Sequence, residues 1–580
     1  MICHQWHTRN WRDNISRVRR RDYFKKKIGT MRYLRSGIFL VFGICGLSLT
    51  VLAQRDTLSR QTINITSSFK PVLKDAVKIN FSAAPPTPDS ARPRLTYSIP
   101  TGELFTTYQP LALQPLALAI DSTGKWGASN FVKVGFGNYQ TPFFQAGFTL
   151  GNAGNSNLNL FAHYVSSEGS KITNQNFTDA GFTAYGSTIT AKKLELYGKF
   201  GIDQDKYYLY GYNHDTLSYK KSDLLQRYQT ISINGGFRNL DPTQFGLKYH
   251  PDLRIAVFSD NHKATETNAV LDLPLEKYVG DAFGVKLGVN FDFTRYTPGI
   301  GKPITNNIYT LPLALLFKTP NFNLHAGLVP SWDNSSFRLL PDIEAEVILG
   351  TEKTILQLGW LTYYDKGSYQ RYASINPYLS QPIQLLNTRV MERYAGFKGA
   401  ITDYFTYNAK LGYTQYNNMP LFVNDYSNDG KTFLIRNESE LQAVEVQGEV
   451  AFMKAEDLSI SAGFHWRHFT KQETENKPWG IPPRELNSTL RWAILKDLWL
   501  KGDLFFFQGP KYLTSTGGSD SHTNGMDMNA GLEFRITRQL NLWVQANNIF
   551  NKKYQRWNQY QTYGFNILGG IVFRFDQKNN

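Results

Sequence analysis

The chain of 580 residues has only two cysteines, Cys3 and Cys45, and both lie within its first 53 residues. Beyond that point the chain has no thiol, which excludes a disulfide framework and a thiolate metal site. It also lacks, after residue 53, an apolar run of the roughly 20 residues that a membrane-spanning helix needs. Its histidines stand apart without helical metal spacing, so we expect neither a metal nor another cofactor.

The net charge of +16 is concentrated at the start of the chain. Residues 1–53 hold eleven Lys/Arg and two Asp/Glu, which leaves +7 for all the other residues. Those other basic residues are spread along the chain, whereas nucleic-acid binding predicts a cluster on one face. The charge distribution therefore argues against a nucleic-acid partner.

The first 53 residues have the order of an export signal. Two arginines precede the apolar run 37–52, which is followed by the small residue Ala53. This order predicts a signal peptide that is cleaved after Ala53. We predict Met31 as the true start, with residues 1–30 an over-extended reading frame. A long basic n-region that begins at Met1 is the alternative.

Residues 54–127 have a different composition from the rest of the chain. Prolines that break any long regular element occur at Pro85, Pro86, Pro88, Pro93, Pro100, Pro110 and Pro115. A segment of about seventy residues is too short to bury a sizeable core of its own. We predict an irregular segment that lies in the periplasm or in the lumen of a barrel.

From residue 128 to residue 575, apolar and polar residues alternate in one segment after another. In the last segment one face carries Phe565, Ile567, Gly569, Ile571, Phe573 and Phe575, and the other carries Asn566, Gly570 and Arg574. Side chains on a strand point alternately to its two faces, so each segment has one apolar and one polar side. Repeated this often without a convincing amphipathic helix, the pattern predicts an all-β chain that forms one large antiparallel barrel. At roughly 20 residues per strand and its loop, we expect about 22 strands, within a range of about 18 to 22, followed by a polar tail at 576–580.

The predicted connections are of two kinds. Very short ones are expected at 319–321, 402–404, 496–497 and 537–539, and long polar ones at 365–387, 424–440, 470–485 and 508–525. Short periplasmic turns that alternate with long external loops are typical of outer-membrane barrels. The sequence thus predicts a protein of a Gram-negative outer membrane, in contact with outer-membrane lipid and lipopolysaccharide.

Several residues are candidates for a specific role. Gly570, Phe573 and Phe575 resemble the C-terminal signal by which the outer-membrane assembly machinery recognises barrels. Glu344, Glu346, Glu445 and Glu449 are expected to point inward and face Lys or Arg across the lumen. Two groups of aromatic residues at strand positions, Tyr207, Tyr208, Tyr210 and Tyr212 and then Trp499 and Phe505–Phe507, predict an interfacial girdle, with a ligand-stacking platform as the alternative.

Other candidates lie in the predicted loops. The stretches 369–372 and 424–426, rich in Tyr and Asn, suit contacts with an oligosaccharide or a peptide, unless they are ordinary surface loops. Ser519, Asp520, Ser521 and His522 bring together residue types of a catalytic triad, but neighbours in one loop rarely hold triad geometry. We therefore predict that the protein is not an enzyme.

The end of the chain resembles a known family. The stretch Asn547-Asn548-Ile549-Phe550-Asn551-Lys552-Lys553-Tyr554, within 540–554, and the stretch 564–575 are similar to the last two strands of TonB-dependent receptors of the Bacteroidetes type. The resemblance implies a barrel of about 22 strands that takes up scarce, bulky nutrients with energy from the inner membrane. The family also implies a plug domain before the barrel, for which 54–127 is too short. Gln61, Thr62, Ile63, Asn64, Ile65 and Thr66 resemble the segment that pairs with the TonB-type protein by strand addition.

These observations predict an outer-membrane barrel that transports or binds a nutrient at the cell surface without a conventional plug. A barrel this wide leaves a hole unless something fills it, so we expect residues 54–125 and inward-folded loops to occupy the lumen. The alternative is a structural barrel subunit of a multi-protein outer-membrane assembly, with a blocked lumen and no transport. A soluble β-protein is a third reading, which the predicted signal peptide and strand number disfavour.

Overall fold

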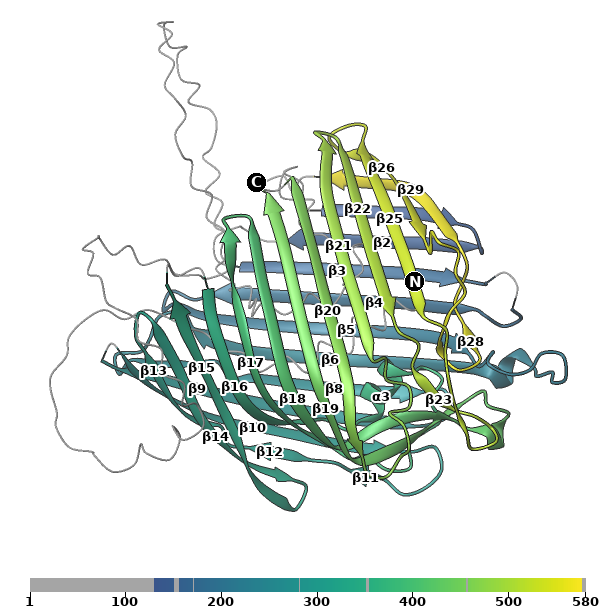
Figure 1. The fold of residues 1–580 in the computed structure, drawn as a ribbon. Helices are drawn as coiled ribbons and strands as arrows, with labels where there is room; N and C mark the ends of the chain where they lie inside the picture. Colours follow the sequence, from purple (N-terminus) through teal and green to yellow (C-terminus); the bar gives the residue numbers. More distant parts are fainter. Residues whose placement is uncertain are drawn as a thin grey trace, which may run out of the picture.

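The computed structural model describes residues 130–150, 156–169, 172–280, 282–350, 354–454 and 457–575. The predicted leader with its cleavage site, the Pro-rich segment and the polar tail lie outside these residues. Within them the alternating segments form long antiparallel strands that curve into one closed barrel (Figure 1). The prediction of an all-β barrel is therefore confirmed.

The strands of the first half are β1 (Asn130–Gly137), β2 (Thr141–Leu150), β3 (Ser156–Ser167), β4 (Phe177–Ile189), β5 (Leu194–Tyr208), β6 (Leu225–Asn239), β7 (Leu247–Tyr249), β8 (Asp252–Asp260), β9 (Thr265–Val279), β10 (Phe283–Thr297), β11 (Ile304–Thr305), β12 (Ile308–Thr310), β13 (Leu313–Lys318) and β14 (Phe322–Asp333). The strands of the second half are β15 (Ser336–Leu349), β16 (Thr354–Asp365), β17 (Thr388–Thr402), β18 (Phe405–Asn424), β19 (Phe433–Lys454), β20 (Leu458–Gln472), β21 (Arg484–Leu495), β22 (Leu498–Phe507), β23 (Lys511–Leu513), β24 (Ser519–Ser521), β25 (Gly525–Arg535), β26 (Leu540–Asn547), β27 (Gln555–Trp557), β28 (Tyr560–Gln561) and β29 (Asn566–Phe575). The helices are η3 (Lys221–Leu224), α3 (Tyr369–Ile375) and η4 (Tyr426–Asn428). None of the helices in the described ranges is long and apolar enough to cross a membrane.

In the described residues the wall contains 22 strands, as predicted. Two strands are interrupted: β7 and β8 both pair with β9, and β11, β12 and β13 all pair with β10. The first and last strands, β1 and β29, pair from Asn130 with Phe575 to Gly137 with Leu568. This pairing closes the sheet, so the wall has no free edge.

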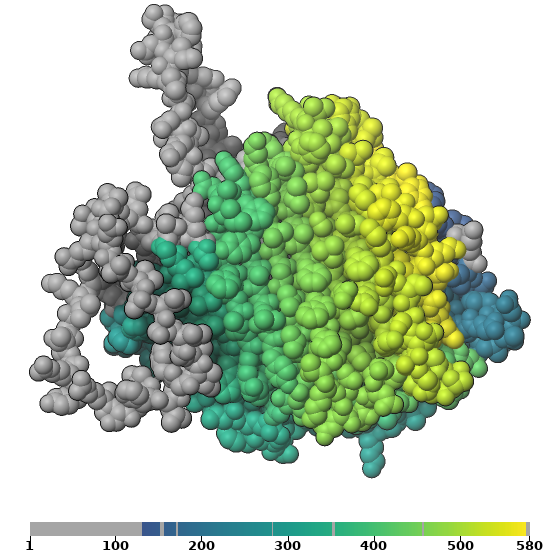
Figure 2. Space-filling model, in the orientation of Figure 1, coloured from purple at the N-terminus to yellow at the C-terminus, as the bar shows by residue number. Residues whose placement is uncertain are grey.

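The apolar face of the strands points outward. On β29, Ile567, Ile571 and Phe573 are 43%, 42% and 45% exposed, whereas the intervening Val572 and Arg574 are buried. The side chains of successive strands pack into a continuous outer surface (Figure 2). An exposed apolar wall around a polar interior is the arrangement of a transmembrane barrel, whose outer surface meets lipid.

The two ends of the barrel differ in their connections. At one end the turns are short, and those predicted at 319–321, 496–497 and 537–539 are found there. The other end carries the long loops, which we take as the extracellular side. One prediction is wrong in part, because much of 424–440 is strand: β19 begins at Phe433 and runs for 22 residues. Crossing a membrane takes only about 9 to 11 strand residues, so β18 and β19 continue past the apolar band.

Candidate functional site

Three extracellular loops fold inward and meet. Loop 209–224 follows β5, loop 366–387 follows β16 and loop 548–565 follows β26. These are the fifth, thirteenth and twenty-first strands of the wall, so the loops start from roughly evenly spaced points around it. We name 209–224, 366–387 and 548–565 the mouth loops, because they join across the extracellular mouth of the barrel.

The mouth loops touch through three tyrosines. The ring of Tyr378 stacks on that of Tyr560 with 3.5 Å between the centroids, and Tyr210 approaches the two rings edge-on, with centroids at 6.0 Å and 4.9 Å. All three side chains are buried. The Tyr210 hydroxyl donates to the carbonyl oxygen of Gln561 at 2.9 Å, and the Tyr560 hydroxyl donates to that of Lys431. Aromatic pairs of this kind stabilise by about 0.5 to 1.5 kcal/mol beyond the area they bury.

Loop 366–387 contains the helix α3, whose first turn is held by the wall. The carboxylate of Glu266, on β9, accepts the backbone N–H of Tyr369 at 2.6 Å and that of Gln370 at 3.2 Å. The Ser368 hydroxyl oxygen caps the helix by accepting the N–H of Arg371 at 3.1 Å. The first N–H groups of a helix have no partner within it, so these acceptors fix its start.

The side chain of Tyr369 extends this anchor. It is fully buried among Tyr228, Phe258 and Tyr296, with ring centroids 6.1, 5.2 and 5.3 Å away. Its hydroxyl donates to the Asp260 carboxylate at 2.8 Å. These partners lie on β6, β8 and β10, so a loop that leaves the wall after β16 is attached to a distant group of strands.

The Asn-rich stretch that carries the family resemblance forms the start of loop 548–565. Asn548 and Asn551 have φ of 48° and 50°, in the left-handed region that Asn tolerates better than most residues. The Asn548 side-chain amide donates to the carbonyl oxygens of Lys552 at 2.8 Å and Tyr563 at 2.7 Å. Tyr554 is buried and donates its hydroxyl to the Asp527 carboxylate at 3.2 Å. The motif therefore shapes the turn that sends this loop into the mouth.

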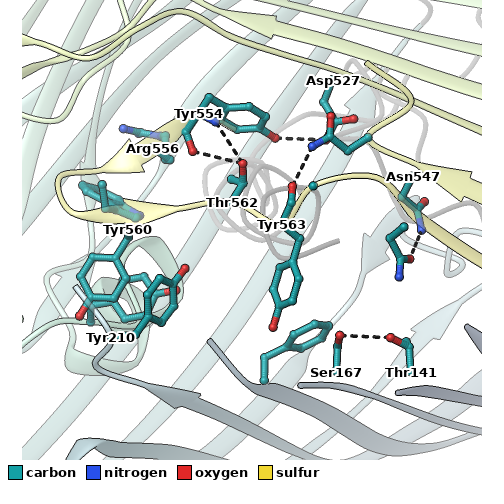
Figure 3. Close-up of a pocket in the computed structure, with 16 residues that line it drawn as sticks. Thr141, Ser167, Tyr210, Asp527, Asn547, Tyr554, Arg556, Tyr560, Thr562 and Tyr563 are labelled. Carbon is teal, nitrogen blue, oxygen red and sulfur yellow. Dashed lines mark hydrogen bonds between the residues drawn. The ribbon is translucent and has the colours of Figure 1, made fainter. Parts of the chain in front are cut away.

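A small cavity of about 60 Å³ lies beside the tyrosine contact (Figure 3). Its lining includes Tyr210, Tyr378, Tyr560 and Tyr563 together with Asp527 and Arg556. Pockets for small molecules usually measure about 300 to 1,000 Å³. The mouth in this conformation therefore has room at the cavity for water, but not for a bulky nutrient.

The structure corrects the prediction for several aromatic residues. Tyr207, Tyr210 and Tyr212 are at most 7% exposed and belong to the same buried cluster as Tyr378 and Tyr560, so they do not form an interfacial girdle. Phe505 and Phe507 are also buried, where both rings pack against Tyr554. The alternation of apolar and polar residues reveals the two faces of a strand. It does not reveal that these strands continue beyond the membrane and that their ends turn inward. The abundance of Tyr in three separate loops is the signal in the sequence that could have revealed this buried cluster.

The same correction applies to the two predicted contact stretches. In the first, Tyr369 and Tyr372 are buried, so neither ring is available to an oligosaccharide or a peptide in this conformation. In the second, Asn424 is buried and the Tyr426 hydroxyl donates to the carbonyl oxygen of Leu513 at 2.7 Å. Both stretches pack against other loops of the mouth.

The inward carboxylates find several kinds of partner. Glu346 pairs with Lys398 at 2.9 Å, but this basic partner lies two strands along the wall, on β17, and not across the lumen as predicted. Glu445 accepts the Tyr416 hydroxyl at 2.6 Å and lies 3.0 Å from Nε2 of His465. Glu344 accepts the Tyr394 hydroxyl at 3.2 Å. Glu449 is buried on the same inward face.

The predicted assembly signal lies on the strand that closes the barrel. Gly570 is opposite Gly135, and a Cβ there would collide with the carbonyl oxygen of Val134. Phe573 points outward, and Phe575 pairs with Asn130 at the short-turn end. A role in recognition stays a prediction for all three. The predicted energy-coupling segment Gln61–Thr66 lies outside the described residues.

The Ser519–His522 cluster is part of the short hairpin of β23 and β24. The Asp520 carboxylate accepts the Tyr512 hydroxyl at 3.1 Å, and the His522 ring stacks on Tyr512 with centroids 4.4 Å apart. These contacts hold the hairpin together. In the described residues no group of three His, Cys, Asp or Glu side chains is placed to hold a metal ion.

Comparison with solved structures identifies the fold. The FrpB iron transporter of Neisseria meningitidis matches with a TM-score of 0.60 and 11% identity, over 79% of this chain and 83% of that one. The pyoverdine outer-membrane receptor FpvA of Pseudomonas aeruginosa matches with a TM-score of 0.57 and 12% identity, over 77% and 78%. The siderophore receptor PirA of Acinetobacter baumannii matches with a TM-score of 0.58 and 11% identity, over 77% and 80%.

The fold is that of a TonB-dependent receptor. No protein-family model matches the sequence, and no curated protein is similar to it by sequence. The receptor fold agrees with what the C-terminal stretch predicted, although that stretch is a small part of the barrel. The neighbours are receptors and transporters rather than enzymes.

Proposed function

We propose that the protein takes up a nutrient across the outer membrane through a barrel whose mouth is closed by its own loops. The fold supports this proposal, since the structural neighbours include an iron transporter and siderophore receptors. The observation that carries it is the meeting of the three mouth loops at Tyr210, Tyr378 and Tyr560. A nutrient enters only when these loops separate, so the tyrosine contact is the gate of the pathway.

The proposed nutrient is bulky and carries groups that tyrosine side chains recognise. When the mouth loops separate, the tyrosines that are buried in the closed mouth become accessible, so that their rings stack on a ligand and their hydroxyls hydrogen-bond to it. Ferric siderophores are the first class to test, because two of the structural neighbours are a pyoverdine receptor and a siderophore receptor. We also propose that a signal peptide directs export of the protein. Residues Gln61–Thr66 would pair by strand addition with a TonB-type protein, which supplies the energy for uptake.

The alternative is a structural subunit of a multi-protein outer-membrane assembly, with a lumen that stays blocked. The tight packing of the mouth favours it, because the cavity beside the tyrosine contact measures only about 60 Å³. A structural subunit needs partner proteins in fixed proportion, whereas a transporter does not. Extraction in mild detergent followed by affinity purification therefore separates the two functions.

A reversible lock on the gate tests uptake directly. Residues 54–580 contain no cysteine, so Tyr378→Cys with Tyr560→Cys supplies the only thiol pair after signal cleavage. A cleavable bis-maleimide would join the two loops. We expect the joined protein to lose uptake of radioactive iron supplied as a ferric siderophore, and to regain it when the linker is cut.

The two single-cysteine variants are the controls, because each carries one of the substitutions and cannot be bridged. Unchanged uptake in the bridged protein would contradict a gate at this contact. No uptake in any variant or in the wild type, together with stoichiometric partner proteins, would support the structural alternative.

A further inference from the structure

Two neighbouring strands of the wall separate near the extracellular end. β15 pairs with β16 from Leu349 with Thr354 up to Asp342 with Leu361, and the ladder stops there. Residues 336–341 continue only along β14, and residues 362–365 continue only along β17. Pro341 stands at the fork, where it has no N–H to donate to a ladder. The fork thus opens a gap between two strands that are paired from Leu349 with Thr354 up to this point.

A cavity of about 280 Å³ occupies this fork. It is lined by Phe337, Arg338, Leu339, Leu340, Pro341, Thr362, Arg389 and Met391. Its volume is far larger than that of the cavity in the mouth and is close to the lower limit of about 300 Å³ for small-molecule pockets. We name it the fork cavity.

The polar atoms of the fork cavity lack partners. Arg389 donates from Nη2 to the side-chain oxygen of Asn417 at 2.7 Å, but its buried Nε has no hydrogen-bond acceptor. The buried Oγ1 of Thr362 also has no hydrogen-bond partner. Across the described residues, no carboxylate forms an ion pair with Arg338 or Arg389. Buried polar atoms without partners are costly, and two guanidinium groups beside one cavity suit an oxyanion with several acceptor oxygens.

The surroundings of the fork cavity are apolar. Phe337 and Leu339 are 56% and 53% exposed on the outer face of β15. Further from the loop end, Leu358 and Trp360 of β16 are 44% and 42% exposed. Arg389 lies on the outer face of β17 at the extracellular border of the apolar band, where a lipid has its headgroup. Arg338 alternates with Phe337 and Leu339 along β15 and lines the cavity at the unpaired margin of that strand. A free anion would leave these apolar side chains uncovered, whereas the acyl chains of a lipid cover them.

We propose that the fork cavity binds a phosphate group of an anionic lipid of the outer leaflet, with the acyl chains lying along the outer face of β15 and β16. The chemical class is a phosphorylated glycolipid such as the lipid anchor of lipopolysaccharide. Arg338 and Arg389 contact the phosphate oxygens, and Thr362 contributes its hydroxyl. This site is on the outer wall, so it is separate from the gate and does not depend on the proposed transport.

Native mass spectrometry of the purified barrel in detergent tests the proposal. The probe is bis-phosphorylated lipid A, compared with lipid A from which both phosphates have been removed and with inorganic phosphate. Loss of a hydrogen bond to a charged group weakens binding by about a factor of ten or more. We therefore expect Arg338→Gln with Arg389→Gln to lower the affinity for lipid A at least tenfold.

Arg227→Gln is the matched control, since Arg227 is also exposed on the outer face of the wall near its extracellular end, but on β6 and outside the cavity. It should bind lipid A as the wild type does. Equal affinity of the wild type for phosphorylated and dephosphorylated lipid A would overturn the proposal without any variant. Inorganic phosphate that competes as well as lipid A would overturn the lipid assignment, and an equal loss of affinity in Arg227→Gln would show attraction to surface charge instead of a site.

Discussion

The wall and the mouth of this barrel are stabilised in different ways. In the wall each strand is paired with its two neighbours by backbone hydrogen bonds, and 22 strands form a ring without an edge. In the mouth the contacts are between side chains of loops 209–224, 366–387 and 548–565, which come from separate parts of the sequence. Elements joined by few side-chain contacts open at a lower free energy than a continuous ladder does. The proposed gate therefore lies in the part of the molecule that opens at the lower free energy.

The largest expected effect comes from breaking the wall at its closure. In Gly570→Ala the added Cβ collides with the backbone of Val134, so β1 and β29 have to move apart. We expect most of the protein to fail to form a closed barrel, which the mobility shift between unheated and heated samples on a gel measures. Gly569→Ala is the control, because a Cβ there meets atoms only at ordinary distances of 3.5 Å and more. A normal shift in Gly570→Ala would show that the seam tolerates the movement.

The next effect comes from breaking the mouth while the wall is kept. Tyr378→Ala with Tyr560→Ala removes the stacked pair, and loss of a buried aromatic side chain costs about 3 to 5 kcal/mol. The mouth loops should separate, so trypsin should cut after Arg371 and Arg556 much faster on reconstituted vesicles. Tyr164→Ala, a loss of the same side chain from the exposed outer face of β3, should change neither rate. Equal cutting in all three proteins would mean that other contacts hold the mouth.

A smaller effect is expected at the link between wall and mouth. Glu266→Ala leaves the N–H groups of Tyr369 and Gln370 without their acceptor, and an unsatisfied buried donor costs about 1 to 3 kcal/mol. Hydrogen exchange at those two amides should accelerate about tenfold or more, while the strand amides of β9 stay protected. Uniform acceleration along β9 would instead show that Glu266 is needed by the wall itself.

The smallest effect concerns the hairpin of β23 and β24. Burial, followed by the nearby positive charge of Arg556, lowers the pKa of His522 from 6.5 to about 4. The folded hairpin thus favours the neutral ring, and its stability is complete above pH 6.5 and is lost as the pH falls from 6.5 towards 4. Protection factors in 508–524, which correct for the intrinsic pH dependence of amide exchange, should fall over that range and stay constant above it. His522→Gln should remove the dependence on pH, and a variant that keeps it would assign the effect to Asp520 or another group.

The sequence predicted the wall better than the mouth, for a physical reason. Alternation is a local property, so residues such as Ile567 and Arg574 reveal their faces from their own neighbours in the chain. The contact of Tyr378 with Tyr560 joins positions far apart, and nothing within either loop specifies it. The fork cavity was missed for the same reason, because Arg338 and Arg389 become neighbours only when the ladder between β15 and β16 ends.

The pairing of β1 with β29 also constrains how the molecule is made. Until its final ten residues are available, the growing sheet has two bare margins, each with a row of amide and carbonyl groups that attract any other extended chain. The ring is completed only when the two ends of the described chain come together, and until then the unfinished sheet must be shielded from other extended chains.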